Sequence, residues 1–288
     1  MSNAPYPYAR PRTLDEAVTL LASGDVRILS GGTDFYPSLG DRVARDPVVD
    51  ISGLGELRGV SRESGHFRIG GLTTWTDIIR TSLPCCFDAL KSAAREVGSV
   101  QIQNRGTVAG NLCNASPAAD GVPPLLALDA EVELASRRGT RRLPLDVFIN
   151  GARSTLLAPD EMMTAVVTPL PASTIRSAFF KLGARRYLVI SIVMVAVALD
   201  VVEGIVCDAR IAVGACSAVA QRMREAERRL IGAPAGPDLG RSIEAKDLAR
   251  LSPIDDVRAS ADYRRDAALT LVRRAVAACA LGQTGGVV

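Results

Sequence analysis

The chain has 288 residues, of which 48% are hydrophobic and 23% charged, and its net charge is +3. This profile is typical of a globular protein of about two domains and excludes a disordered, collagen-like or coiled-coil chain. The small net charge and the 4% aromatic content argue against a nucleic-acid or anionic-membrane partner.

A short β-α-β unit is predicted at the start of the chain, over residues 1–56. Thr13 and Glu16 have capping-box spacing, which predicts a helix that begins at Thr13 and ends before Gly24. Two strands complete the unit, at 26–29 and 47–51.

A second unit is predicted over residues 57–175. Thr74 and Asp77 repeat the capping-box spacing at the start of a short helix. Residues 98–121 are rich in Gly, Asn and Ser and predict a long loop. The elements expected around it are a strand at 67–70, helices at 74–79 and 88–97, a helical segment at 125–128 and a strand at 131–135.

A third unit is predicted over residues 176–288, after prolines at 169 and 171 that disfavour both helix and central strand. The apolar run 188–199 predicts a buried strand, and the alternating run 207–213 predicts a half-buried strand. Glu203-Gly204 predicts the hairpin turn between them. Helices are expected at 219–230 and 262–281, the second with its arginines mostly off the apolar face.

The segment from Ile28 to Phe35, ILSGGTDF, ends a predicted strand in two glycines. Successive backbone N–H groups with no side chains in the way can form a concave nest that suits a pyrophosphate. A simple turn after the strand is the alternative. The segment matches neither the G-x-G-x-x-G motif nor the P-loop.

A second polar segment, residues 104–120, is flanked by hydrophobic sequence. Long loops of this kind inside a compact domain are usually functional or disordered. Its glycine N–H groups and its Thr and Asn side chains suit phosphates, whereas the Asp120 carboxylate suits a ribose hydroxyl or a ring N–H. A helix N-cap ahead of Pro123 is the alternative role for Asp120.

The six cysteines contain no C-x-x-C pair and the chain has one histidine, so neither a zinc site nor an iron–sulfur ligand run is expected. Scattered thiols indicate a reduced, cytoplasmic protein. The N-terminal sequence has no apolar signal segment, and the longest apolar run, 188–199, is too short to span a membrane.

The two polar segments, in this order, resemble the flavin-binding loops of the FAD-binding medium subunit of molybdenum hydroxylases, the xanthine dehydrogenase and carbon monoxide dehydrogenase family. Other matching pieces lie along the whole chain: Tyr8-Ala9-Arg10-Pro11, Ile69-Gly70-Gly71-Leu72-Thr73-Thr74, Ser116-Pro117 and the run Asp256–Arg265. Ala109-Gly110 departs from the Gly-Gly that this family often has. The resemblance excludes the subtype with a [4Fe–4S] insertion, because the clustered cysteines are absent.

The resemblance implies an α+β fold of the PCMH or vanillyl-alcohol-oxidase type. Two FAD-binding subdomains, 1–56 and 57–175, would precede a C-terminal domain, 176–288, with a three-stranded antiparallel sheet and a helical bundle. FAD would be bound noncovalently, because no His or Cys stands at a plausible linkage position. The resemblance implies no catalytic residue and no metal ligand on this chain.

The resemblance also implies which residues bind FAD. The pyrophosphate would be wrapped by Leu29, Ser30, Gly31, Gly32, Thr33, Asp34 and Phe35. The diphosphate and ribityl contacts would be completed by Gly106, Thr107, Gly110, Asn111 and Asn114. Asp120 would bind an adenosine hydroxyl or a nearby polar group, and Gly98 would lie on the adenine side. Met163 would lie by the flavin ring, Tyr187 would cover a ring face, and Lys181 would stabilise the reduced ring at its pyrimidine edge.

Simpler roles compete for several residues. Lys181 could be a surface lysine ahead of the apolar strand. His66 is expected to be solvated or packed, and Cys85-Cys86 to form a turn with packed thiols. The Arg-rich stretch 222–229 is expected to be a solvated helix face, with a subunit contact as the alternative.

The function implied is that of the flavin subunit of a heteromeric molybdenum hydroxylase. A large subunit would carry molybdopterin and a small subunit the [2Fe–2S] clusters, and FAD on this chain would reduce an external acceptor, for which NAD is one candidate. The alternatives are a self-contained flavin oxidase or reductase of the same superfold, and a flavin-free scaffold. The donor-rich loops argue against the scaffold.

Overall fold

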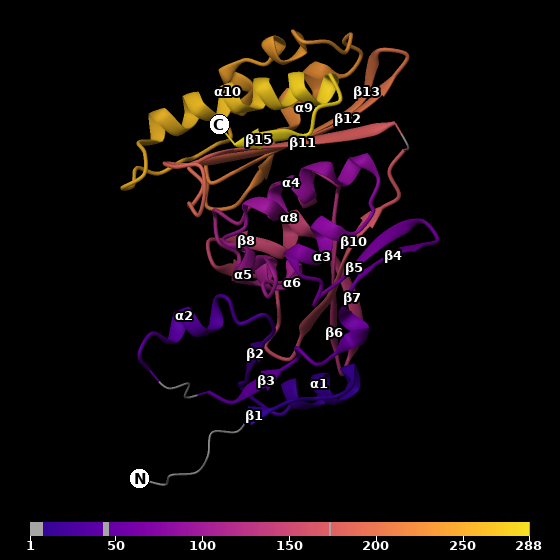
Figure 1. Cartoon of the computed structure of the whole chain (residues 1–288), viewed down its shortest axis with the longest axis vertical. Coiled ribbons are helices and arrows are strands. Elements are labelled where there is room, and N and C mark those ends of the chain that lie inside the picture. Colours follow the sequence, from indigo (N-terminus) through magenta and orange to yellow (C-terminus); the bar gives the residue numbers. More distant parts are fainter. Residues whose placement is uncertain (1–7, 43–45, 173, 288) are drawn as a thin grey trace.

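The computed structural model describes residues 8–42, 46–172 and 174–287, and the first seven residues of the N-terminal sequence inspected for a signal peptide lie outside them. Three units are stacked along the long axis, with the N-terminal unit at the bottom and the C-terminal unit at the top (Figure 1). Within the described ranges, no helix combines the length and the apolar character needed to cross a membrane.

The N-terminal unit is the predicted β-α-β arrangement around a small parallel sheet. Its strands are β1 (Tyr8–Ala9), β2 (Arg27–Leu29) and β3 (Val48–Asp50), in the order β1-β3-β2, with helices α1 (Leu14–Leu21) and α2 (Phe35–Leu39). Thr13 caps α1 by accepting from the N–H of Glu16 at 3.2 Å. The Glu16 carboxylate accepts from the N–H of Arg12, at 2.7 Å, so the predicted capping box is only half formed.

The middle unit is built on a five-stranded antiparallel sheet. Its order is β4 (Val60–Glu63), β5 (His66–Gly70), β10 (Met162–Pro169), β6 (Glu131–Ser136) and β7 (Gly139–Pro144). The helices are α3 (Trp75–Arg80), α4 (Asp88–Glu96), α5 (Val100–Gln103), α6 (Val108–Asn114), α7 (Val122–Ala127) and α8 (Leu145–Phe148). A small hairpin, β8 (Ile149–Gly151) and β9 (Ser154–Thr155), follows α8.

The prediction of a long loop over 98–121 is wrong, because α5 and α6 lie within it. Ser99 caps α5 by accepting from the N–H of Ile102, and Thr107 caps α6 by accepting from the N–H of Gly110. These caps satisfy N–H groups of the first turn, which compensates for the low helix propensity of Gly and Asn.

The C-terminal unit has a five-stranded sheet rather than the expected three. Its order is β14 (Gln221–Arg222), β13 (Ile205–Gly214), β12 (Val193–Val202), β11 (Ile175–Leu182) and β15 (Gly285–Val287). Strands β11, β12 and β13 are the predicted antiparallel set; short β14 adds a fourth antiparallel strand and β15 pairs parallel with β11. The helices are α9 (Arg224–Leu230) and α10 (Ala261–Ala280).

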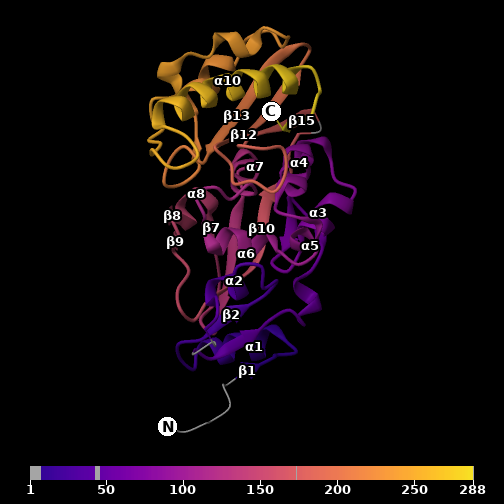
Figure 2. The ribbon, with the colours of Figure 1, turned by 60° about the vertical axis from the view of Figure 1, so that its left-hand side comes forward.

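The C-terminal sheet is covered on both faces. Helix α10 packs on β11 and β12, while α4 packs on β11 and α7 on β12 and β13. Figure 2 shows α4 and α7 beneath this sheet and α10 above it. Because β12 contacts a helix on each side, its first seven residues, 193–199, are buried, which explains why that part of the strand is entirely apolar.

Four predictions for this unit need correction. The helix expected at 219–230 begins only at Arg224, because Gln221 and Arg222 pair with β13 as β14. The buried strand starts at Val193, not at 188, and Leu188 is exposed with a left-handed φ of +52°. Arg264 is buried on α10, where it donates to the carbonyl of Ile192 at 2.7 Å. Arg222 is also buried and donates to Glu227 at 3.1 Å, so the stretch 222–229 is not wholly a solvated face.

The domain boundaries at residues 56 and 175 stay predictions. The buried hydrophobic side chains form three clusters, one centred on α1 and β3, one on the middle sheet and its helices, and one between β12 and α10, and the first cluster also includes Leu72, Ala135 and Met162 of the middle unit. The middle cluster includes inward-facing residues of the C-terminal sheet, so the second and third units share a core.

Candidate functional site

A cavity of about 570 Å³ lies between the N-terminal and middle units. Its walls come from the end of β2, from the start of α2, from α6 and from the start of β10. Residues of both polar segments identified in the sequence therefore line one cavity.

The first wall is the chain that leaves β2, residues Ser30–Asp34, which line the cavity. In the described part of the chain, no acceptor pairs with the backbone N–H groups of residues 31–34. Gly32 has a φ of +78°, and a Cβ on Gly31 would lie 2.0 Å from the carbonyl oxygen of Arg105. Glycine is thus required at both positions, for backbone conformation at one and close approach at the other.

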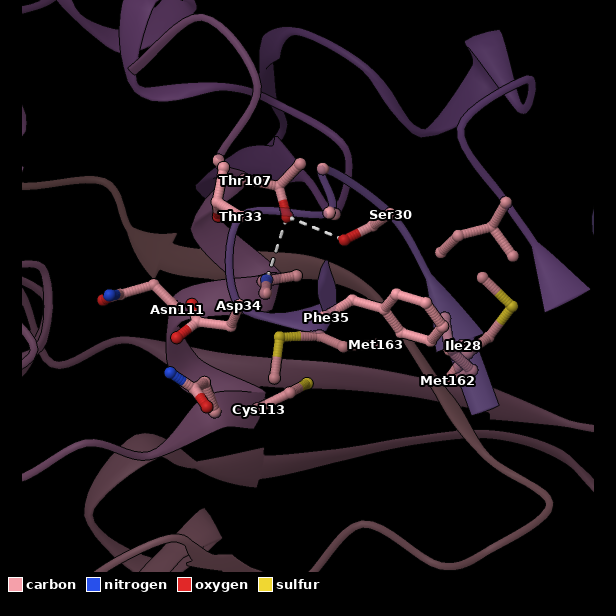
Figure 3. Close-up of a pocket in the computed structure, with 18 of the residues that line it drawn as sticks. Ile28, Ser30, Thr33, Asp34, Phe35, Thr107, Asn111, Cys113, Met162 and Met163 are labelled. Atoms are coloured by element: carbon pink, nitrogen blue, oxygen red, sulfur yellow. Dashed lines mark hydrogen bonds between the residues drawn. The ribbon is translucent and has the colours of Figure 1, made fainter. Parts of the chain in front are cut away.

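The second wall is held against the first by the residues around Thr107. The carbonyl of Gly106 accepts from the N–H of Trp75 at 3.2 Å. The Thr107 hydroxyl accepts from the N–H of Gly110 at 3.0 Å and lies 3.4 Å from the Ser30 hydroxyl, as the dashed lines in Figure 3 show. Ser30 and Thr107 thus join segments that are far apart in the sequence.

The cavity has a polar side and an apolar side. The Asn111 side-chain oxygen is buried without a hydrogen-bond partner among the described residues, and Asn114 lines the same space. In Figure 3, Asn111 lies at one side of the view and Ile28, Phe35 and Met162 lie at the other. The apolar side chains that line the cavity include Ile28, Ile51, Leu157, Met162 and Met163.

A second cavity, of about 370 Å³, adjoins the first toward the C-terminal unit. The two share lining residues on α6, Asn111 and Asn114. Gly98, Asp120 and the segment 188–190 complete its wall. The two cavities together form one elongated site.

Asp120 is the buried carboxylate of this second cavity. Its Oδ2 accepts from Lys181 Nζ at 2.7 Å, and its Oδ1 accepts from the Ser191 hydroxyl at 2.6 Å. Burial raises the pKa of the Asp120 carboxyl, and the hydrogen bonds from Lys181 and Ser191 oppose that rise. Lys181 also donates to the carbonyl of Glu96, at 3.3 Å.

These contacts decide between the roles considered for Asp120 and Lys181. Gly121, not Asp120, occupies the N-cap position of α7, so the N-cap alternative is wrong. The Lys181 side chain is 2% exposed, so the surface-lysine alternative is wrong as well. The polar group near Asp120 is Lys181.

The remaining predicted residues fall into two groups. Those that line one or both cavities are Ser30, Gly31, Gly32, Thr33, Asp34, Phe35, Gly98, Gly106, Thr107, Gly110, Asn111, Asn114, Asp120 and Met163. Leu29 is buried behind the wall, Lys181 lies behind Asp120, and Tyr187 is exposed with the Arg186 guanidinium 5.2 Å from its ring centre. What each of these residues binds stays a prediction.

Among the residues of the site that escaped the sequence analysis are Glu96 and Arg153, which line the second cavity, and Ser191, which binds Asp120. Each belongs to the site through a contact between distant segments, which no local pattern signals. Among the described residues, no group of three or more His, Cys, Asp or Glu side chains is placed to hold a metal ion.

Comparison with known proteins gives two family matches that together span most of the chain. Residues 3–171 match the FAD binding domain in molybdopterin dehydrogenase, and residues 178–279 match the CO dehydrogenase flavoprotein C-terminal domain.

Individual relatives agree with these matches. The xanthine dehydrogenase FAD-binding subunit of Escherichia coli O157:H7 is 33% identical, with 97% of each chain covered. The nicotinate dehydrogenase FAD-subunit of Eubacterium barkeri is 39% identical, with 80% of each covered. A chain of the reconstituted CO dehydrogenase from Oligotropha carboxidovorans is 27% identical and superposes with a TM-score of 0.90, covering 98% of this chain and 100% of that one.

Proposed function

The chain belongs to the family of FAD-binding medium subunits of molybdopterin-dependent hydroxylases, and from this we propose that it carries electrons within such a complex. We propose that it receives them from [2Fe–2S] clusters on a small partner subunit and delivers them to an external acceptor. A large partner subunit would hold the molybdopterin at which the substrate is oxidised. The cytoplasmic location stays a prediction.

The residues of the elongated site fit FAD. The observation that carries the proposal is the set of N–H groups at residues 31–34, which have no acceptor among the described residues and belong to a segment that lines the first cavity together with α6; such donors suit a pyrophosphate. A Cβ on Gly31 would meet the carbonyl oxygen of Arg105 and one on Gly32 the ring of Tyr36, so glycine at both positions keeps the cradle in this conformation. The unpartnered, buried oxygen of Asn111 calls for a donor such as a sugar or ribityl hydroxyl.

We also propose which end of the site takes which ring. Lys181 is expected to serve the flavin, and its ammonium group binds the Asp120 carboxylate. Asp120 and Gly98 line the same cavity, so both would lie at the flavin end of the site. Met163 lines only the first cavity, whose apolar side suits the adenine. We therefore assign Gly98 to the flavin and Met163 to the adenine, the reverse of the placement expected from the sequence.

FAD supplies, when bound, a redox group that can exchange electrons singly or in pairs, which suits a link between one-electron clusters and a two-electron acceptor. The chain's own residues orient it and set the charge around it. The Lys181–Asp120 pair presents the carboxylate to the cavity with the ammonium directly behind it. No observation favours a self-contained oxidase, because His66, the sole histidine, lines neither cavity and pairs with Glu63 at 3.0 Å.

The test is isolation of the complex from the native host through a tag on this chain. Two further chains, one larger and one smaller, should copurify together with molybdenum and iron. Substrates of the isolated complex should bleach the flavin absorbance in the absence of an acceptor. A flavin-containing chain that purifies alone and oxidises a substrate by itself would contradict the proposal.

A further inference from the structure

Arg153 lies in the turn between β8 and β9 and lines the second cavity. Its φ of +57° falls in the left-handed region that side chains other than Gly seldom adopt. Its N–H donates to the carbonyl of Ala115 at 2.8 Å, and Ala115, at the end of α6, also has a positive φ, of 45°. Arg153 and Ala115, both in an uncommon backbone conformation, are thus hydrogen-bonded to each other beside the second cavity. The surrounding structure must stabilise this conformation.

The side chain of Arg153 acts on the same end of α6. Its guanidinium donates to the side-chain oxygen of Asn114. Because arginine has donors and no acceptor, the amide atom that faces it is fixed as oxygen rather than nitrogen. Among the described residues, none accepts a hydrogen bond from the Asn114 amide nitrogen, so both of its N–H donors remain for a ligand in the cavities that Asn114 lines.

One turn earlier on α6 is Asn111. Asn111 lines the same space, but its side-chain oxygen is buried, has no partner among the described residues and lies beside Gly121. Without Arg153, the amide of Asn114 could turn about its last torsion and offer either edge. With Arg153 in place, the Asn114 amide offers its donor edge.

We propose that Arg153 is a positioning residue of the cofactor site, which holds the oxygen of Asn114 so that the amide presents its donor edge to the bound FAD. This inference rests on the proposed function. It adds to the cofactor site a residue from the β8–β9 turn, which the sequence analysis did not identify.

The experiment measures the dissociation constant of FAD for the full chain after its flavin has been removed and titrated back. R153A and N114A should each weaken binding about tenfold, the size expected for one charge-assisted hydrogen bond. Because Arg153 acts through Asn114, the double variant should bind only about as weakly as either single variant, within about twofold. R153K keeps one donor and a charge, so its affinity should stay within about threefold of wild type.

Two further variants keep the outcome decisive. N114D keeps an oxygen for Arg153 but loses the donor edge of the amide. Its affinity for FAD should fall at least as much as that of N114A, while its melting temperature should stay that of wild type. An unchanged affinity for FAD would overturn the proposal even if R153A does not fold. R228A removes an exposed arginine that pairs with Glu225 on α9, far from either cavity wall, and should bind as wild type.

Failure of the inference and failure of the proposed function give different results. A wild-type chain that binds no FAD contradicts the proposed function. A wild-type chain that binds FAD, with R153A within about twofold of it or with effects of R153A and N114A that simply add, contradicts the role of Arg153 alone.

Discussion

Lys181 Nζ lies 2.7 Å from Asp120 Oδ2, and the two side chains are 2% and 9% exposed. Lys181 belongs to β11, whereas Asp120 precedes α7 in the middle unit. Ser191, ahead of β12, holds the other carboxylate oxygen. Both oxygens of the Asp120 carboxylate, which lines the second cavity, therefore accept hydrogen bonds from the C-terminal unit. That unit is thus part of the site.

Lys181→Met should lower the midpoint potential of the bound flavin, because it leaves the negative charge of Asp120 beside the ring to be reduced. Asp120→Asn should raise the potential, since the positive charge of Lys181 then lacks a partner. The shifts should be about 30 mV or more, since 30 mV is about 1.4 kcal/mol for a two-electron couple. Redox titration of both variants checks the signs, and identical midpoints would remove the pair from any role at the flavin.

The same substitutions should affect folding. Lys181→Met leaves a buried carboxylate without its partner, which should reduce the free energy of unfolding by about 3 kcal/mol. The double variant Lys181→Met/Asp120→Asn has no buried charge at this place and should recover much of that loss. Denaturant unfolding of the three proteins measures this, and a double variant less stable than Lys181→Met would contradict the reasoning.

Thr107→Val should weaken both helix α6 and the cofactor site. It removes the oxygen that accepts from the N–H of Gly110 and that lies 3.4 Å from the Ser30 hydroxyl. Loss of the cap alone should reduce the free energy of unfolding by about 1 kcal/mol. Thr13→Val is the matched control, because Thr13 caps α1 in the same way and lines neither cavity. Both should lower the melting temperature, and only Thr107→Val should release flavin more readily.

The sequence predicted those parts of the structure that local patterns determine. Thr74 and Asp77 form the predicted capping box, and the hairpin turn at Glu203-Gly204 lies between β12 and β13. The glycines of the first polar segment indicated a cradle because their conformational freedom is a property of the residue itself. The order of the motifs, through the resemblance, gave the fold class.

Contacts between distant segments escaped prediction. Nothing near Asp120 in the sequence indicates that Lys181 and Ser191 bind it, and nothing near Asn114 indicates Arg153. The short helix α5 was missed for a related reason, because a helix of four residues depends on its cap and on tertiary contacts rather than on its own pattern. Strand β7 was missed because as a mostly exposed edge strand it lacks an apolar face.

Asp256 should contribute to acid sensitivity. Hydrogen bonds from the backbone N–H of Arg258, and then from the Arg264 and Arg258 side chains, hold the pKa of its carboxyl well below the usual range. A carboxyl with a lowered folded-state pKa stabilises the protein above its unfolded pKa, near 4, and this stabilisation is lost as the pH falls below that value.

Asp256→Asn should therefore be less stable than wild type at neutral pH, and its stability should fall less steeply below about pH 4. Unfolding free energies measured across this range provide the test. Asp262→Asn is the control, since the Asp262 side chain is 96% exposed, and it should follow the wild-type profile. Parallel profiles for wild type and Asp256→Asn would contradict the assignment.

Cys113 should resist alkylation although it lines the first cavity. Burial raises the pKa of its thiol to about 12, so almost none of the reactive thiolate is present at neutral pH. Cys207 is exposed and should react with iodoacetamide. Mass spectrometry of the flavin-free chain after brief treatment compares the two; modification of Cys113 as fast as Cys207 would show that the cavity wall opens.

The central claim is that the elongated site between the three units holds FAD without a covalent bond. The most direct measurement is the identity and amount of flavin released when the purified, flavin-loaded chain is precipitated with acid. The account predicts FAD in the supernatant, at about one per chain, as expected for a single concave cofactor site. Flavin that stays with the pellet, or a chain that takes up no FAD when it is supplied, would contradict it.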